Sequence, residues 1–257
     1  MGKFSTRLIR KGALISETRD VLSTWDFDRS VKDNLHQVVA DHVLHAKSEA
    51  WMREMVVTLS SRFSAMPPHE LHSLGWLARA PVASDVWQAC LLWHIGRVDT
   101  LYYEFAVDWL FQQFQNGIYL VRTEDCVPFV KACVKRQSRH KRELSEYGTV
   151  RAARDLLRMA SDVGLLTPGT PKQFTHYHLP EDAFLYILHA IHSSTGSVEK
   201  TVNRLDWRMY FMVPADVERE LLRLHQFHKL HYEVAGSLAQ LKLPCASVAD
   251  YARELAA

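Results

Sequence analysis

The sequence predicts a mainly α-helical protein, with an N-terminal helical bundle followed by helices that alternate with short β-hairpins. Three observations predict it. Apolar residues recur at helical spacing along most of the 257 residues. Ser and Asp residues stand before many of these runs as candidate helix caps. Two strand-like stretches, each close to a glycine-containing turn, interrupt the second half. We expect two domains, residues 1–122 and 123–257.

The first half is predicted to consist of successive helices. Apolar runs at helical spacing cover residues 14–25, 35–43, 51–63, 87–95 and 105–110. Candidate caps precede the last four runs, in order Ser30, Ser48, Ser84 and Asp99. Pro67 and Pro68 are expected to stop the third helix. Aromatic and methionine residues at helical spacing are more typical of a packed core than of a cofactor site.

The second half begins with two predicted helices. One starts at Thr123 and continues to about residue 134, and the other is expected to begin at Thr149 as its N-cap and to stop at Gly164. A Gly/Pro loop follows, and residues 174–178 have strand composition before Pro180 opens an acidic helix start. This order of elements is that of a winged helix-turn-helix: a helix, a short strand, a Gly/Pro tip and a returning strand.

A second helix-plus-hairpin unit is predicted near the C-terminus. Its helix starts at Pro214, and its strands, residues 230–234 and 238–243, flank an Ala-Gly-Ser turn. Ser247 is the candidate cap of a last helix. The region from residue 123 onward is therefore expected to be winged-helix-like, with two such units.

The formal net charge of +2 conceals an uneven distribution. Residues 1–11 carry four cations and no acid, and residues 131–158 carry nine cations and three acids. The remaining residues are net acidic. The basic block coincides with the two helices that precede the predicted wing, so near neutrality in total does not exclude nucleic-acid binding.

The spacing of arginines suggests how this block could act. Arg151, Arg154 and Arg158 share one helical face, opposite an apolar face. Arginine clamps phosphates and contacts base edges, and helix-turn-helix proteins place such a helix in the major groove. A solvated helix face is the alternative interpretation. The candidate DNA-contacting residues, including the helix cap, the wing and a basic N-terminal arm, are Lys135, Arg136, Arg139, Lys141, Arg142, Thr149, Arg151, Arg154, Arg158, Lys172, Gln173, Lys3, Arg7, Arg10 and Lys11.

Other chemistry is not motivated by the sequence. The 14 histidines include the series His225, His228 and His231, but no zincin motif or paired Cys-x-x-Cys accompanies them. No phosphate-binding glycine loop or nucleophile elbow occurs. We therefore expect no enzyme activity, metal, cofactor or small-molecule substrate. Unpaired cysteine spacing, the absence of a signal-like N-terminus and short apolar runs predict a cytoplasmic protein that does not enter a membrane.

Three stretches carry a resemblance to a known family. They are Phe4-Ser5-Thr6-Arg7-Leu8 with Lys11-Gly12-Ala13-Leu14-Ile15-Ser16-Glu17-Thr18, the segment from Arg154 to Leu166 that ends in Gly-Leu-Leu, and Asp206-Trp207-Arg208 with the final predicted helix and hairpin. Together they resemble BrxA, the small accessory protein of BREX phage-defence systems. The resemblance implies a helical fold whose N-terminal bundle is similar to the antitermination factor NusB, binding to double-stranded DNA, and partners among the other BREX proteins.

The leading hypothesis is a non-enzymatic component of a phage-defence complex that binds double-stranded DNA. Affinity would come mainly from phosphate neutralisation, with strong salt dependence and low sequence selectivity. Two alternatives remain open at this stage. One is a protein-protein adaptor whose basic block binds an acidic partner, and the other is an RNA-binding protein, suggested only by the similarity to the antitermination factor.

Overall fold

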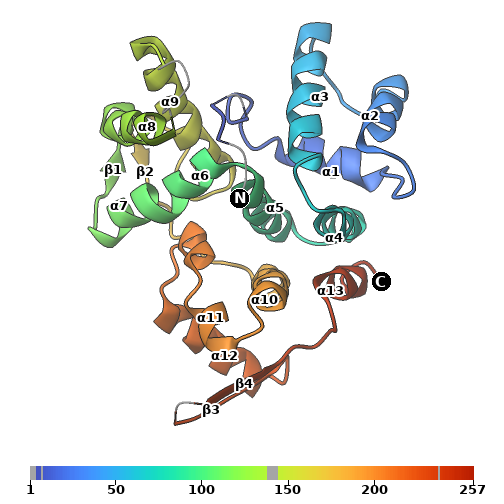
Figure 1. The fold of residues 1–257 in the computed structure, drawn as a ribbon, viewed down its shortest axis with the longest axis vertical. Helices are drawn as coiled ribbons and strands as arrows, with labels where there is room; N and C mark the ends of the chain where they lie inside the picture. Colours follow the sequence, from blue (N-terminus) through green and yellow to red (C-terminus); the bar gives the residue numbers. More distant parts are fainter. Residues whose placement is uncertain (1–3, 7, 138–143, 237) are drawn as a thin grey trace.

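The structure, a computed structural model, describes residues 4–6, 8–137, 144–236 and 238–257. It is mainly helical, as predicted, with short antiparallel strand pairs (Figure 1). Lys3, Arg7, Arg139, Lys141 and Arg142 lie outside the described residues.

The N-terminal helices follow one another with short connections. Their bounds are α1 Ile15–Ser23, α2 Val31–Ala40, α3 Glu49–Phe63, α4 Pro68–Arg79, α5 Ser84–Val98, α6 Thr100–Glu104, the π-helix η1 Phe105–Leu110, and α7 Phe111–Gln115. The side chains of Ser30, Ser48 and Asp99 accept hydrogen bonds from backbone N–H groups in the first turns of α2, α3 and α6. These three predicted caps are confirmed.

One local prediction for this half was wrong, and another was incomplete. Ser84 is the first residue of α5 and makes no capping hydrogen bond across the helix start, where Ala83 is the N-cap residue. Pro68 does more than end α3, because it opens α4 at a position where a helix needs no N–H donor. The predicted stop signal was therefore also the start of a helix that the apolar pattern did not reveal.

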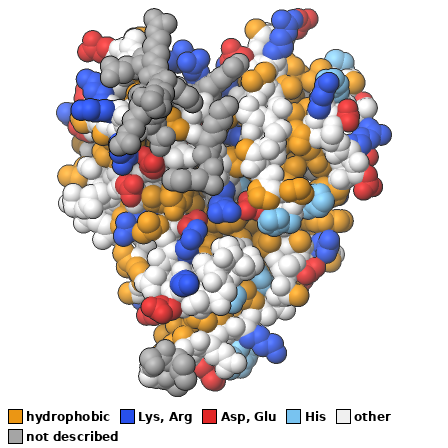
Figure 2. Space-filling view, viewed as in Figure 1, with side chains coloured by type: hydrophobic (Ala, Val, Ile, Leu, Met, Phe, Trp, Pro, Cys, Tyr) orange, Lys and Arg blue, Asp and Glu red, His pale blue; other side chains and the backbone are white. Residues whose placement is uncertain are grey.

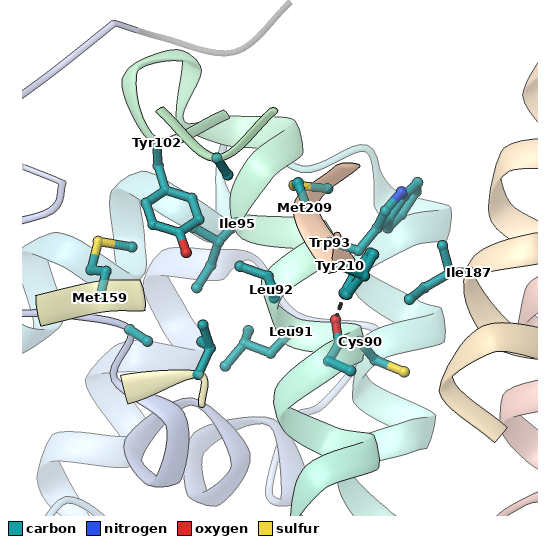
Figure 3. Packing of buried hydrophobic residues seen from close by; sticks show 14 of the residues in the cluster. Cys90, Leu91, Leu92, Trp93, Ile95, Tyr102, Met159, Ile187, Met209 and Tyr210 are labelled. Carbon is teal, nitrogen blue, oxygen red and sulfur yellow. Dashed lines mark hydrogen bonds between the residues drawn. The ribbon is translucent and has the colours of Figure 1, made fainter. Parts of the chain in front are cut away.

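Helix α5 lies at the centre of the core. Eleven of its 15 residues are buried, so it is covered on all sides. Around it in Figure 3 lie Met159 of α9, Ile187 of α10, and Met209 with Tyr210. The Tyr210 hydroxyl donates to the Ala89 carbonyl at 2.9 Å, which satisfies the one polar atom of a ring that is otherwise in apolar surroundings.

The next unit combines two helices with a small sheet. Strand β1 (Leu120–Val121) precedes α8 (Thr123–Gln137) and α9 (Glu146–Asp162), and pairs antiparallel with β2 (Lys172–Gln173). Leu166 bridges Phe174 on the other side of the returning chain. The strand expected over residues 174–178 thus lies two residues earlier, at 172–174. The composition of residues 174–178 favours a strand, but the pairing partners at 120–121 and 166 determine which residues form it.

The start of α9 also differs from the prediction. The side chain of Ser145 accepts a hydrogen bond from the Gly148 N–H at 3.1 Å, so the N-cap lies four residues before the predicted cap at Thr149. Thr149 is buried, and its hydroxyl donates to the Ser145 carbonyl at 3.0 Å. Both residues have hydroxyl groups that can cap a helix, but Thr149 lies inside α9, where its hydroxyl donates to a backbone carbonyl and does not accept from a backbone N–H. Gly164, at φ +79°, follows the helix end as predicted.

The C-terminal elements return to the N-terminal helices. They are α10 Glu181–Thr195, α11 Val198–Val202, the 3-10 helix η2 Leu205–Tyr210, α12 Pro214–Gln226, β3 His231–Ala235, β4 Leu238–Lys242 and α13 Val248–Glu254. The predicted hairpin and last helix are confirmed, with His231 opposite Lys242 and Ser247 as the cap. In Figure 1, α13 lies beside α4 and α10 beside α5. These contacts cross residue 122, and the two-domain division stays a prediction.

Candidate nucleic-acid interface

The last part of the predicted basic arm forms a loop, residues 8–14, that we call the arm loop. It lies between α3 and α9 (Figure 1). From α3, the guanidinium group of the buried Arg62 donates to the backbone carbonyls of Ala13 at 2.7 Å, Gly12 at 2.8 Å and Leu8 at 3.1 Å. Arg62 thus fixes the arm loop through its backbone carbonyls, independently of the side chains of the loop.

Helix α9 holds the same loop from the other side. The Arg158 guanidinium donates to the Arg10 carbonyl at 2.6 Å, and the Ala13 N–H donates to the Asp162 carboxylate at 3.1 Å. Gly12 lies in the left-handed region at φ +75°, and a Cβ there would collide with the Asp162 carboxylate. The close approach of loop and helix therefore requires glycine at this position.

This contact brings the arm together with the basic face of α9. Four exposed arginines, Arg10, Arg151, Arg154 and Arg158, act electrostatically on the one carboxylate of Asp155. Burial raises the pKa of Asp155, and the four arginines oppose that rise. Of the four arginines, only Arg151 forms an ion pair with the Asp155 carboxylate, with Nε 3.8 Å from Oδ2. Two parts of the sequence about 140 residues apart thus form one positively charged surface, the arginine cluster.

An aromatic residue on the same face escaped the sequence analysis. Tyr147, in the first turn of α9, is 72% exposed. Its spacing to Arg151, Arg154 and Arg158 places the four side chains on one stripe of the helix. The signal was present in the sequence as a tyrosine four residues before the first arginine, but the helix was predicted to start after it.

Several predicted contact residues are already bound to the protein itself. Lys11 pairs with Glu54 and lies 4.0 Å above the ring centroid of Trp51. Arg136 donates to Glu104 at 2.8 Å. An exposed ion pair contributes little to stability, but each of these carboxylates neutralises a cation that the sequence analysis assigned to DNA.

The predicted wing residues are also engaged. The Lys172 ammonium donates to the Thr167 carbonyl at 3.4 Å, and burial lowers the pKa of Lys172. The Gln173 side chain accepts from the Tyr119 hydroxyl at 3.2 Å. Lys135, in contrast, is exposed beside a cavity of about 500 Å³ between α8 and the start of α9.

The surface around α8 and α9 carries both positively and negatively charged side chains. Figure 2 shows Lys and Arg side chains around the part formed by α8 and α9, with acidic groups among them. Within the described ranges, no group of three or more His, Cys, Asp or Glu residues could hold a metal ion. No helix in those ranges is long and apolar enough to cross a bilayer.

Comparison with known proteins adds the family. Residues 2–190 match the BrxA family model. The chain belongs to the BrxA family. BrxA proteins are associated with BREX systems, so this chain is a component of antiviral defence. The matched residues include the arm loop, α8 and α9, whereas α11, α12, α13 and the β3–β4 hairpin follow the end of the match.

A solved structure supports the fold of this BrxA chain. It is titled "Crystal structure of an uncharacterized protein from Magnetospirillum magneticum" and has 10% sequence identity and a TM-score of 0.60. The similarity covers 79% of this chain and 97% of that one. No curated protein matches the sequence. At such low identity the likeness concerns the fold alone.

Proposed function

We propose that the chain is a non-enzymatic protein that binds double-stranded DNA within a BREX system, mainly through phosphate contacts and with low sequence selectivity. The observation that carries the proposal is the arginine cluster, in which Arg10, Arg151, Arg154 and Arg158 converge on one surface. Guanidinium groups bind phosphate oxygens in a planar, bidentate geometry. The cluster holds four such groups around one buried carboxylate, that of Asp155, so its net charge is positive and suits a polyanion.

The order of the elements supports this assignment. Strand β1, helices α8 and α9, the Leu166 bridge and strand β2 follow one another in the order of a winged helix-turn-helix. In that arrangement α9 is the helix that enters the major groove. Its exposed stripe of Tyr147 and arginines would face the DNA, while Lys172 and Gln173 support the wing more than they contact phosphate.

The proposal predicts a defined salt dependence. Four phosphate contacts give a log-log slope of about −3.6, and each further cation adds about −0.9. Anisotropy titration of a short duplex over a series of salt concentrations measures this slope. The double variant Arg151→Ala, Arg154→Ala should reduce it by about 1.8. Absence of duplex binding at roughly 50 mM salt would refute the proposal.

A matched control separates a local contact from a general loss of charge. Arg29→Ala combined with Arg219→Ala removes the same charge from exposed residues outside the cluster, each paired with an aspartate. This control should retain the wild-type slope. If both double variants reduced the salt slope equally, the DNA-binding site would have to lie outside the arginine cluster. Competition with structured RNA of equal length distinguishes duplex DNA from an RNA ligand.

A protein-protein adaptor is a second candidate function. Ile118, Tyr119 and Leu120 are 40%, 66% and 37% exposed, and they run into the edge strand β1. Consecutive exposed apolar residues at a sheet edge are typical of a binding surface. Ile118→Asp should weaken co-elution with another BREX protein after nuclease treatment without changing duplex affinity. An unchanged elution profile would argue against this surface.

A further inference from the structure

Arg62 is a buried cation without an ion pair. Its side chain is 1% exposed, and none of the described carboxylates forms a salt bridge with it. Asp99 and Asp162 act on it only through longer-range attraction. Burial lowers the pKa of Arg62 to about 10, so the group stays charged at neutral pH. Burying such a charge is costly unless its donors are satisfied.

The Arg62 guanidinium makes three hydrogen bonds through Nη1 and Nη2, all to one short piece of backbone, whereas no described residue accepts a hydrogen bond from its Nε. The three carbonyls that it binds belong to Leu8, Gly12 and Ala13, the two ends of the turn in the arm loop. A guanidinium group offers donors in a rigid fork, which lets one side chain join both ends of a turn. Lysine has a compact ammonium group and cannot reproduce this fork.

The arm loop in turn fixes Arg10. Its carbonyl receives the Arg158 guanidinium, and the neighbouring Ala13 N–H reaches Asp162, so the loop backbone is held on both sides. The Arg10 side chain lies within electrostatic range of Asp155, together with the α9 arginines. Without Arg62, the loop would keep its contacts to α9 and the side-chain contacts of Lys11 to Glu54 and Trp51. Its backbone would lose all three bonds to Arg62, and Arg10 would no longer be fixed in place.

We infer that Arg62 is a positioning residue for DNA binding: it acts through Arg10, by fixing the arm loop so that Arg10 completes the arginine cluster. This inference rests on the proposed function. Arg62 itself touches no phosphate. Its substitution should therefore lower duplex affinity only as long as Arg10 is present.

A double-mutant cycle tests this dependence. One phosphate contact is worth about eightfold in affinity at roughly 0.1 M salt, so Arg10→Ala should cost about that much and reduce the salt slope by about 0.9. Arg62→Lys should cost a similar factor. In the Arg10→Ala background, Arg62→Lys should add less than about twofold. A full further eightfold loss would overturn the inference, because general destabilisation lowers affinity in either background.

A second variant covers the case in which Arg62→Lys does not fold. Gly12→Ala places a Cβ against the Asp162 carboxylate at a positive φ, so the carboxylate or the loop must shift, and the variant should reproduce the dependence on Arg10. Gly117→Ala is its control: Gly117 also has positive φ but has no atom near a built Cβ and lies outside the arm loop. The control should keep wild-type affinity and slope. Full additivity of Gly12→Ala with Arg10→Ala would also overturn the inference.

A readout without DNA separates this inference from the proposed function. Trypsin should cleave after Arg10 or Lys11 slowly in the wild type and at least several-fold faster in Arg62→Lys and Gly12→Ala. Unchanged cleavage would refute the positioning role even if DNA binds. Faster cleavage with no duplex binding by any form would refute the proposed function and leave Arg62 as an anchor of the loop alone.

Discussion

Asp155 shows how one side chain can limit a binding surface. The residue is 7% exposed, and its carboxylate lies within electrostatic range of the four arginines of the cluster. It reduces repulsion between guanidinium groups, but it also repels phosphate. Arg62 is its counterpart below the surface, a cation that binds carbonyls instead of an acid. The sequence held a signal for Arg62, because it falls on the apolar stripe of Met55 and Leu59.

We predict that Asp155→Asn strengthens duplex binding. The amide keeps the shape of the side chain and removes one negative charge close to the phosphates, which at about 8 Å in water is worth about twofold in affinity. Anisotropy titration at low salt measures the gain. Asp108→Asn, a change of the same charge on η1, should leave affinity unchanged. Weaker binding by Asp155→Asn would show that the carboxylate orients Arg151 more than it repels DNA.

His189 makes stability depend on pH. It is 2% exposed, stacks on Tyr251 of α13 at 5.2 Å, and burial lowers its pKa from 6.5 to about 4. The folded state therefore prefers the neutral ring, and its contribution is complete above the unfolded pKa of 6.5 and is lost as the pH falls toward 4. At pH 5.5 this costs about 1 kcal/mol.

The corresponding variant is His189→Gln. It should lose less stability than the wild type between pH 7.5 and 5.5, by about 1 kcal/mol, whatever its stability at neutral pH. Urea denaturation at the two pH values gives this difference. His178→Gln, at an exposed position, should behave like the wild type. Parallel pH dependence of wild type and His189→Gln would contradict the prediction.

At the scale of single elements, local signals predicted most of the helices and the C-terminal hairpin, but not α4 or the pairing of β1 with β2. The caps at Ser30, Ser48 and Ser247 were predictable because each depends on a few adjacent residues. The pairing of β1 with β2 joins residues about 50 positions apart, and no local pattern specifies it. The arginine stripe of α9 was predicted, but the arm loop that completes the cluster depends on a buried contact to α3.

The true start of α9 can be tested at its cap. Ser145→Ala removes the acceptor for the Gly148 N–H and should cost about 1 kcal/mol in the free energy of unfolding. Ser145→Asp should retain most of that stability, since aspartate is an equally good N-cap. Chemical denaturation compares the two variants. If Ser145→Ala is as stable as the wild type, the cap does not hold the first turn that carries Tyr147.

At the scale of the whole molecule, the core is continuous. Buried residues from α1 to α13 form one cluster, and α5 is enclosed by elements from both sides of the predicted domain boundary. α13 covers α4, and α10 covers α5. The charge pattern showed which segments are rich in cations, but helical periodicity could not show which helices from the two halves would pack together.

A fragment of residues 1–122 should not fold as the intact chain does. Without residues 123–257 it exposes the faces of α4 and α5 that α13 and α10 cover. We expect such a fragment to bind a hydrophobic dye and to lack the near-UV circular dichroism of packed aromatic rings. Removal of Ala256 and Ala257 alone is the control and should preserve the spectrum. A native-like spectrum from the fragment would show that the N-terminal bundle is independent.

Salt should weaken the charged surface without loosening the arm loop, because the hydrogen bonds from Arg62 to the loop are buried. Mobile ions screen outward-facing guanidinium groups, but they do not reach Arg62 and its three carbonyls. Under the proposed function, a salt pulse should therefore release DNA and leave the arm loop in place. Rebinding after dilution then requires no reordering of the chain, and its rate should be set by diffusional encounter alone.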